Sequence, residues 1–102
     1  MDELADRSLS EWLDAASDTL LNRGFEYGDP RDNLLRICKI CRILGIQLRD
    51  PSDLALVFIA TKLSRMVESP QREDSYLDLI GYSSLLAYTR FVGDGWNDLD
   101  TY

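Results

Sequence analysis

The fold class of this protein is decided by one stretch, residues 50–67: Asp50-Pro51-Ser52-Asp53-Leu54-Ala55-Leu56-Val57-Phe58-Ile59-Ala60-Thr61-Lys62-Leu63-Ser64-Arg65-Met66-Val67. It opens with an Asp-Pro pair, in which Asp can cap a helix and Pro fits the first helical turn. Residues 54–60 are apolar around the whole helical circumference, and the stretch is too long for a typical strand. We therefore predict a helix, and its apolar circumference predicts that it is the central helix of the fold.

The sequence before this stretch predicts a first helix. Ser8-Leu9-Ser10-Glu11 has the spacing of a capping box, and the apolar residues that follow recur at helical intervals. These signals predict a helix over residues 9–22. Gly24 and Gly28 are expected to interrupt it.

Start and stop signals also define two other helices. Asp29-Pro30 starts a helix near residue 30, and Gly45 closes it. Ser69-Pro70 ends the helix of the opening stretch, and a fourth helix is predicted over residues 72–91. The inward stripe of the second helix is expected to consist of Asn33, Ile37, Ile40, Cys41 and Leu44.

Length and helix content predict a compact all-α protein. The 102 residues suit one hydrophobic core, so we expect a single four-helix-bundle-like domain over residues 1–92. Residues 93–102 form a predicted acidic tail in which Trp96 is a candidate for docking. Four short helices cover an apolar third helix incompletely, which predicts a homo-oligomer.

Charge, hydropathy and residue types exclude several functions. The net charge of −7 repels phosphate backbones and argues against general nucleic-acid binding. The longest apolar run, residues 54–60, is far shorter than the about 20 residues that span a bilayer. The N-terminus lacks a secretory signal, so a cytoplasmic protein without a membrane span is expected. The chain has no histidine, which removes serine–histidine and cysteine–histidine catalysis and imidazole metal ligands.

Lys62 is a charged residue on an otherwise apolar helix face. It lies one turn from Phe58 and one turn from Met66, so helical geometry carries its ammonium group toward the core. An isolated buried ammonium is very costly, and it needs an anionic partner. Asp78 on the fourth helix is the natural partner.

Neighbouring polar residues extend this pair into a predicted pocket. Arg65 follows Lys62 by three residues and points to nearly the same side of the helix. Gly81 is expected to give another backbone room to approach closely. The predicted pocket consists of Lys62 and Arg65 from the third helix and Asp74, Asp78 and Tyr82 from the fourth.

Two interpretations of this pocket stay open. In the first, a buried Lys62–Asp78 pair fixes the register of the helices and binds no ligand. In the second, Lys62 and Arg65 hold a ligand phosphate, because the planar guanidinium can bind two oxygens and lysine adds a mobile charge. The base or sugar of that ligand would meet Tyr27, Asn33, Tyr82 or the two carboxylates.

Cys38-Lys39-Ile40-Cys41 is a further motif that could carry chemistry. A C-x-x-C can be a redox pair or half of a zinc site, but no second ligand pair and no histidine accompany it. Both cysteines fall in the apolar pattern of the second helix. We interpret them as reduced core cysteines, and no metal or cofactor is expected from the sequence itself.

The combined pattern resembles a family of small helical domains of unknown function found mainly in bacteriophages. The resemblance covers roughly residues 23–88 and is carried by the combination Y-G-x-P-x-x-N, K-x-x-R and D-S-x-x-D-x-x-G-Y. It implies an all-α, phage-encoded protein without an established activity. The residues that carry it are Arg23, Tyr27-Gly28-Asp29-Pro30, Asn33, Gly45, Asp53, Ala55, Lys62, Arg65, Pro70, Asp74-Ser75, Asp78 and Gly81-Tyr82.

Residues 74–82, Asp74-Ser75-Tyr76-Leu77-Asp78-Leu79-Ile80-Gly81-Tyr82, are also distantly similar to the last motif of MazG-like all-α nucleoside triphosphate pyrophosphohydrolases. In that superfamily an E-E-x-x-E cluster on the preceding helix joins these carboxylates to bind magnesium ions. Here the preceding helix offers Lys62 and Arg65 instead. The resemblance then implies at most Asp74 and Asp78 as magnesium ligands.

Three functions follow as expectations. The first is a phage accessory protein that binds a nucleotide or a nucleotide-derived host-defence signal, such as a cyclic oligonucleotide. The second is a MazG-like pyrophosphohydrolase that acts on nucleotide pools with Mg²⁺. The third is an acidic inhibitor that binds a host protein, with Trp96 in the contact. We rank binding above catalysis because basic residues replace the expected acids.

Overall fold

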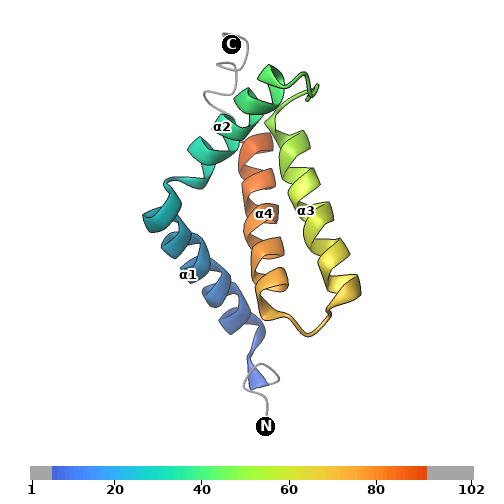
Figure 1. Ribbon diagram of the computed structural model, residues 1–102. Coiled ribbons are helices and arrows are strands. Elements are labelled where there is room, and N and C mark those ends of the chain that lie inside the picture. Colours follow the sequence, from blue (N-terminus) through green and yellow to red (C-terminus); the bar gives the residue numbers. More distant parts are fainter. Residues whose placement is uncertain (1–5, 92–102) are drawn as a thin grey trace.

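The computed structural model describes residues 6–91, which form four helices and no strand (Figure 1). The all-α class is therefore confirmed for this part of the chain. The acidic tail and Trp96 lie outside the described residues. The helices are α1 (Leu9–Tyr27), α2 (Pro30–Ile43), α3 (Pro51–Glu68) and α4 (Glu73–Phe91).

The fourth helix is the central one. α3 and α4 form an antiparallel hairpin, and α1 packs against α4 from the other side, so that α4 lies between them (Figure 1). The prediction that α3 is central was wrong. Its apolar circumference is not covered all round, since Val57 is 54% exposed and Val67 is 85% exposed.

Local capping signals fix the starts of three helices as predicted. The Ser8 hydroxyl accepts a hydrogen bond from the Glu11 N–H at 3.2 Å, which caps α1. The Asp29 carboxylate accepts from the Arg31 N–H at 2.8 Å, and the Asp50 carboxylate accepts from the Ser52 N–H at 2.8 Å. Hydrogen bonds from the Arg31 side chain and backbone lower the pKa of Asp29. These caps satisfy N–H groups that have no partner inside the helix.

The first helix continues past the residue that was expected to interrupt it. α1 includes Gly24 and ends at Tyr27, whereas the sequence predicted an end near residue 22. Glycine in a helix interior costs only about 1 kcal/mol, which the contacts of α1 with α4 offset. Gly28 ends the helix, because its φ of 88° favours glycine.

The inward face of α2 is rotated by one residue from the prediction. Leu34 and Cys38 are buried, whereas Ile40 and Leu44 of the predicted stripe are exposed. Asn33, the polar member of the predicted stripe, is also exposed. The rotation is about 100° and places the α2 face against α3, where Leu54 packs on Leu34 and Cys38.

The hydrophobic core is small. Leu34 is the one large side chain in the described part of the chain that is fully buried. The buried apolar residues are Ala16, Leu34, Cys38, Leu54, Ala55 and Leu77. Both cysteines are free, with Cys38 in the core and Cys41 half-buried. Among the described residues, 6–91, no helix is long and apolar enough to cross a bilayer.

Candidate functional site

Three helices bring opposite charges together at Asp78. Lys62 Nζ of α3 lies 2.8 Å from Asp78 Oδ2 of α4, as the helical spacing predicted. Arg23 Nη1 of α1 lies 2.6 Å from Asp78 Oδ1. The Asp78 side chain is 3% exposed and that of Lys62 is 9% exposed, so this cluster is a buried ion pair to which Arg23 adds a half-exposed guanidinium.

The two oxygens of Asp78 differ in their hydrogen bonding. Oδ1 is buried and accepts no hydrogen bond, although Arg23 Nη1 is close to it. The guanidinium thus neutralises the charge without an N–H aligned on the oxygen. A buried carboxylate oxygen without an aligned donor is costly, and the positive charge of Arg23 offsets part of that cost.

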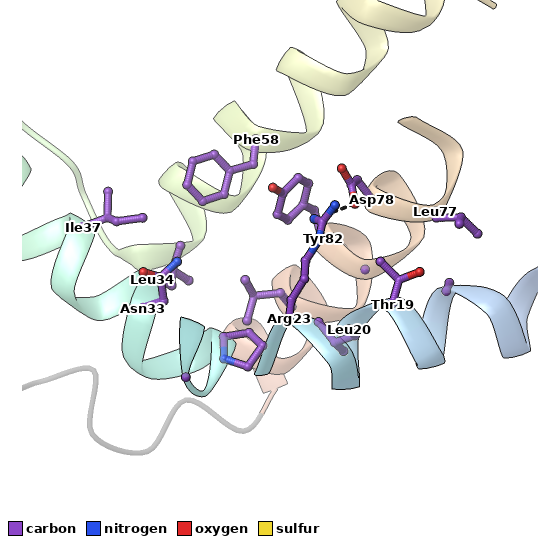
Figure 2. A pocket seen from close by; sticks show the side chains of 15 residues that line it. Thr19, Leu20, Arg23, Asn33, Leu34, Ile37, Phe58, Leu77, Asp78 and Tyr82 are labelled. Atoms are coloured by element: carbon purple, nitrogen blue, oxygen red, sulfur yellow. Dashed lines mark ion pairs between the residues drawn. The ribbon is translucent and has the colours of Figure 1, made fainter. Parts of the chain in front are cut away.

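A cavity of about 510 Å³ opens beside this cluster. All four helices contribute to its wall: Arg23 extends from α1 toward Asp78 on α4, with Asn33 on α2 and Phe58 on α3 across from them (Figure 2). Most of the wall is apolar. Its lining consists of Ala16, Thr19, Leu20, Arg23, Gly28, Pro30, Asn33, Leu34, Ile37, Phe58, Leu77, Asp78, Gly81, Tyr82 and Leu85.

An aromatic pair forms one side of the cavity. The rings of Phe58 and Tyr82 have their centroids 5.1 Å apart and are tilted by 39° (Figure 2). The cavity continues over Gly81, where an added Cβ would meet no atom within 4 Å. The expectation of a close backbone approach at Gly81 was therefore wrong. The missing side chain leaves open space at the cavity wall instead.

A smaller cavity of about 340 Å³ adjoins the first. The two share Leu20, Pro30, Gly81 and Leu85. The smaller one adds Asp29, Arg31, Ser84 and Tyr88. Arg31 Nη1 donates a hydrogen bond to the Tyr88 hydroxyl at 2.8 Å, and Arg31 Nη2 lies 2.6 Å from Asp29 Oδ2. Each of the two cavities is therefore bordered by an arginine that is paired with a carboxylate.

The structure brings together only some of the predicted site residues. Asn33, Asp78 and Tyr82 line the larger cavity, and Lys62 reaches the same carboxylate without lining it. Arg65 is exposed and lies on another part of α3. Tyr27 is the last residue of α1, and its side chain lies outside what the structure describes.

Asp74 belongs to a separate, exposed ion pair. Its Oδ1 lies 3.4 Å from Arg72 Nε, and Asp74 is not among the residues that line the cavity. Desolvation raises the pKa of Asp74, but the hydrogen bond from Arg72 and the charges of Arg72 and Lys62 bring it below its ordinary value. Asp74 is thus close enough to Lys62 to feel its charge, yet it does not join the Asp78 cluster.

Asp74 and Asp78 are the carboxylates that the resemblance to the pyrophosphohydrolases implies as magnesium ligands. Within residues 6–91 the side chains of His, Cys, Asp and Glu form no group of three that could hold a metal ion. Asp78 already faces two cationic side chains. A magnesium ion at Asp78 would have to displace Lys62 or Arg23 from the carboxylate.

Arg23 is the site residue that sequence reasoning missed. It belongs to the family pattern, but the predicted pocket does not include it. The signal that could have found it is helical periodicity, because Ala16, Leu20 and Arg23 recur on one face of α1 and all line the cavity. Its contact with Asp78 depends on how α1 crosses α4, which periodicity does not fix.

Comparison with known proteins gives a family without a known activity. No curated protein and no solved structure matches this chain. Residues 11–90 match a family described as a domain of unknown function, DUF6378. That range includes the four helices almost completely, together with Arg23, Lys62 and Asp78. The chain therefore belongs to the DUF6378 family.

Proposed function

We propose that this protein is a phage accessory protein that binds a nucleotide or a nucleotide-derived signal in the cavity beside Asp78, in the cytoplasm of the host. The observation that carries the proposal is a local excess of positive charge in an acidic protein. Lys62 and Arg23 bring two positive charges to one carboxylate, whereas the whole chain has a net charge of −7. An anionic group is attracted to this cavity despite the overall field.

The volume of the cavity supports a ligand of the size of a nucleotide. Small-molecule sites are typically about 300–1,000 Å³ and are mostly apolar with a few polar groups. The volume of about 510 Å³ and its largely apolar wall fall within that description. The adjoining cavity, bordered by Arg31, would give space for a second nucleotide of a cyclic oligonucleotide.

Arg23 is the proposed phosphate ligand. The sequence suggested Lys62 and Arg65, but Lys62 is engaged with Asp78 behind the cavity and Arg65 lies elsewhere on α3. The Arg23 side chain lines the cavity and is 43% exposed. A guanidinium has five N–H donors, so Arg23 can keep its contact with Asp78 and still bind two phosphate oxygens.

The base is proposed to lie against Phe58 and Tyr82. Aromatic rings bind any base through its π-face, and these two rings flank the cavity. The hydroxyl group of Tyr82, which also lines the cavity, can donate a hydrogen bond to the base or accept one from it. Asn33, on the cavity wall across from Arg23 and Asp78, offers both a donor and an acceptor to the base or sugar.

The two alternatives have less support. A pyrophosphohydrolase needs magnesium on Asp74 and Asp78, and these residues are engaged with Arg72 and with the Lys62–Arg23 pair. An acidic inhibitor of a host protein was proposed to act partly through Trp96, which lies outside the described residues. Binding of a nucleotide as an evasion of host defence is therefore the proposal that we put forward.

A thermal-shift panel tests the proposal. Nucleoside mono-, di- and triphosphates and cyclic di- and trinucleotides would each be added at millimolar concentration, with and without magnesium. We expect at least one of them to raise the melting temperature, because a ligand that binds only the folded state stabilises it. The same samples, assayed for released pyrophosphate, separate binding from hydrolysis. The absence of any shift across the panel would contradict the proposal.

A further inference from the structure

Two cavities meet along one face of α4. Asp78 lines the larger cavity, Tyr88 lines the smaller one, and Gly81 lines both. Gly81 follows Asp78 by three residues and precedes Tyr88 by seven, so all three lie on the same side of the helix. At 1.5 Å per residue, this face extends about 15 Å from Asp78 to Tyr88. We propose that the two cavities form one site and that its ligand is a dinucleotide, with one base in each cavity.

Gly81 joins the two cavities because it has no side chain. It is a helical residue without a positive φ, and a Cβ added there would meet no atom within 4 Å. Neither the backbone conformation nor close packing of the protein therefore requires a glycine at this position, although glycine is less favourable than alanine inside a helix. The space over Gly81 is open to a ligand that extends from one cavity into the other.

The smaller cavity is suited to part of a ligand. Its volume of about 340 Å³ is at the lower end of the about 300–1,000 Å³ that small-molecule sites have. Besides Gly81, three residues line both cavities: Leu20 of α1, Pro30 of α2 and Leu85 of α4. Because the two cavities share these residues, a single molecule can occupy both. A ligand with two bases then covers more of their apolar surface than a mononucleotide does.

The charges differ between the two cavities. At the larger one, Arg23 and the buried Lys62 share the single carboxylate of Asp78. At the smaller one, Arg31 is paired with Asp29, and both residues line the cavity. A phosphate is therefore attracted to the larger cavity, whereas the described lining of the smaller one has no excess of positive charge. This difference assigns a phosphate of the ligand to Arg23 and an uncharged base to the smaller cavity.

Polar groups at the smaller cavity match the edge of a base. Within the described residues, Nε and Nη2 of Arg31 donate to Asp29 and Nη1 donates to the Tyr88 hydroxyl, so two of the five N–H groups of Arg31 can bind a ligand. The Tyr88 hydroxyl can donate its own hydrogen, and the Ser84 hydroxyl can accept a hydrogen bond while it donates to the Gly81 carbonyl. Base edges carry both donors and acceptors. The Arg31 guanidinium over the Tyr88 ring adds planar surface on which a base can stack.

Isothermal titration calorimetry of the full chain tests the inference, which rests on the proposed nucleotide binding. The probes are the 5′-monophosphates of adenosine, guanosine, cytidine and uridine, and for each base the linear 5′-phosphorylated dinucleotide and the cyclic dinucleotide. We expect at least one dinucleotide to bind at least about tenfold more tightly than its mononucleotide, because its second base binds as part of the same molecule. A preference for the linear form or for the cyclic form supports the inference and identifies the linkage.

Two neighbouring serines of α4 give a matched pair of variants. Both are exposed, and Ser84 lines the smaller cavity alone, whereas Ser83 lines neither of the two. Ser84→Leu fills the smaller cavity with a residue that favours the helix, so we expect the preference for the dinucleotide to fall to about twofold or less. Ser83→Leu adds the same side chain one residue away and should keep the preference. Circular dichroism of both variants measures whether they remain helical.

A second variant of the smaller cavity protects the test against misfolding. Arg31→Met removes the guanidinium without filling the cavity, and it should lower the preference for the dinucleotide as well. A dinucleotide that binds wild type no more tightly than its mononucleotide would overturn this inference and leave the proposed function intact. A preference that survives both Ser84→Leu and Arg31→Met would also overturn it. The absence of binding by every probe would contradict the proposed function itself, and this inference with it.

Discussion

Asp78 is the residue that connects the stability of the fold with the binding that we propose. Its carboxylate is buried, and it holds the ammonium group of Lys62 on one oxygen and faces the guanidinium of Arg23 on the other. Charged side chains can be buried here only as partners, because their mutual attraction offsets the free-energy cost of removing each of them from water. The same arrangement holds the guanidinium of Arg23 at the wall of the cavity.

The Lys62–Asp78 pair gives a prediction for the free energy of unfolding. Asp78→Asn leaves the Lys62 ammonium group buried without a counter-charge, so we expect a loss of about 3–5 kcal/mol. In the double variant Lys62→Met, Asp78→Leu, no charge stays buried, because Arg23 can turn to water. Its stability should return to within about 1 kcal/mol of the wild type.

Urea denaturation followed by circular dichroism measures all three proteins. Arg65→Met is the matched control, because it also removes a positive charge from α3 but at an exposed position. A double variant as unstable as the single Asp78→Asn would show that the charges contribute more than their burial costs. That result would contradict this account of the pair.

Cys38 should be the slower of the two thiols to react. Burial and, to a lesser degree, the neighbouring Cys41 raise the pKa of the Cys38 thiol to about 11. Against the ordinary value of 9.0, this lowers its thiolate fraction at neutral pH about 100-fold. Iodoacetamide at pH 8 should therefore modify the half-buried Cys41 first, as measured by peptide mass spectrometry. In urea the two thiols should react with iodoacetamide at equal rates. Equal rates of reaction in the folded protein as well would refute this expectation.

The helices show which signals are local and which are tertiary. The starts of α1, α2 and α3 follow from Ser8, Asp29 and Asp50, because a cap acts on N–H groups two or three residues away. The end of α1 and the face of α2 were predicted wrongly. Both depend on packing against another helix, which propensity and periodicity do not contain.

Gly24 within α1 and Gly28 directly after it should respond in opposite directions to the same substitution. An alanine Cβ at Gly24 would meet no atom within 4 Å, so Gly24→Ala should add about 0.5–1 kcal/mol to the free energy of unfolding. Gly28 has a φ of 88° and a ψ of −179°, a conformation that L side chains rarely adopt. Gly28→Ala should cost about 1–3 kcal/mol.

Thermal and urea unfolding of the two variants side by side test this contrast. Each serves as the control for the other, because the chemical change is the same and the sites are one turn apart. A loss of stability in Gly24→Ala would contradict the continuation of α1 to Tyr27. It would instead favour the helix end near Gly24 that the sequence predicted.

At the scale of the molecule, residues 6–91 have an open interior. Their core contains few large buried side chains, and a cavity of about 510 Å³ is lined by residues of all four helices. A single domain with so little buried apolar surface is expected to have modest stability. A ligand in the cavity would then raise the stability of the whole domain, and not only of the site.

The sequence predicted one half of the site. Lys62 opposite Asp78 followed from the cost of burying an ammonium group, and the structure places them 2.8 Å apart. Arg65 was grouped with Lys62 because three residues separate them, but that spacing rotates it by about 60°, enough to leave it exposed. Arg23 comes from a distant helix, and only the crossing of α1 over α4 brings it to Asp78.

The central claim is that Arg23 holds the phosphate of a nucleotide in this cavity. The most direct measurement is isothermal titration calorimetry of the nucleotide that raises the melting temperature most, with wild type, Arg23→Ala and Arg65→Ala. We predict that Arg23→Ala weakens binding about tenfold or more, because charge-assisted hydrogen bonds are lost, and that Arg65→Ala leaves the affinity unchanged. Unchanged binding by Arg23→Ala, or a loss in Arg65→Ala alone, would contradict the claim.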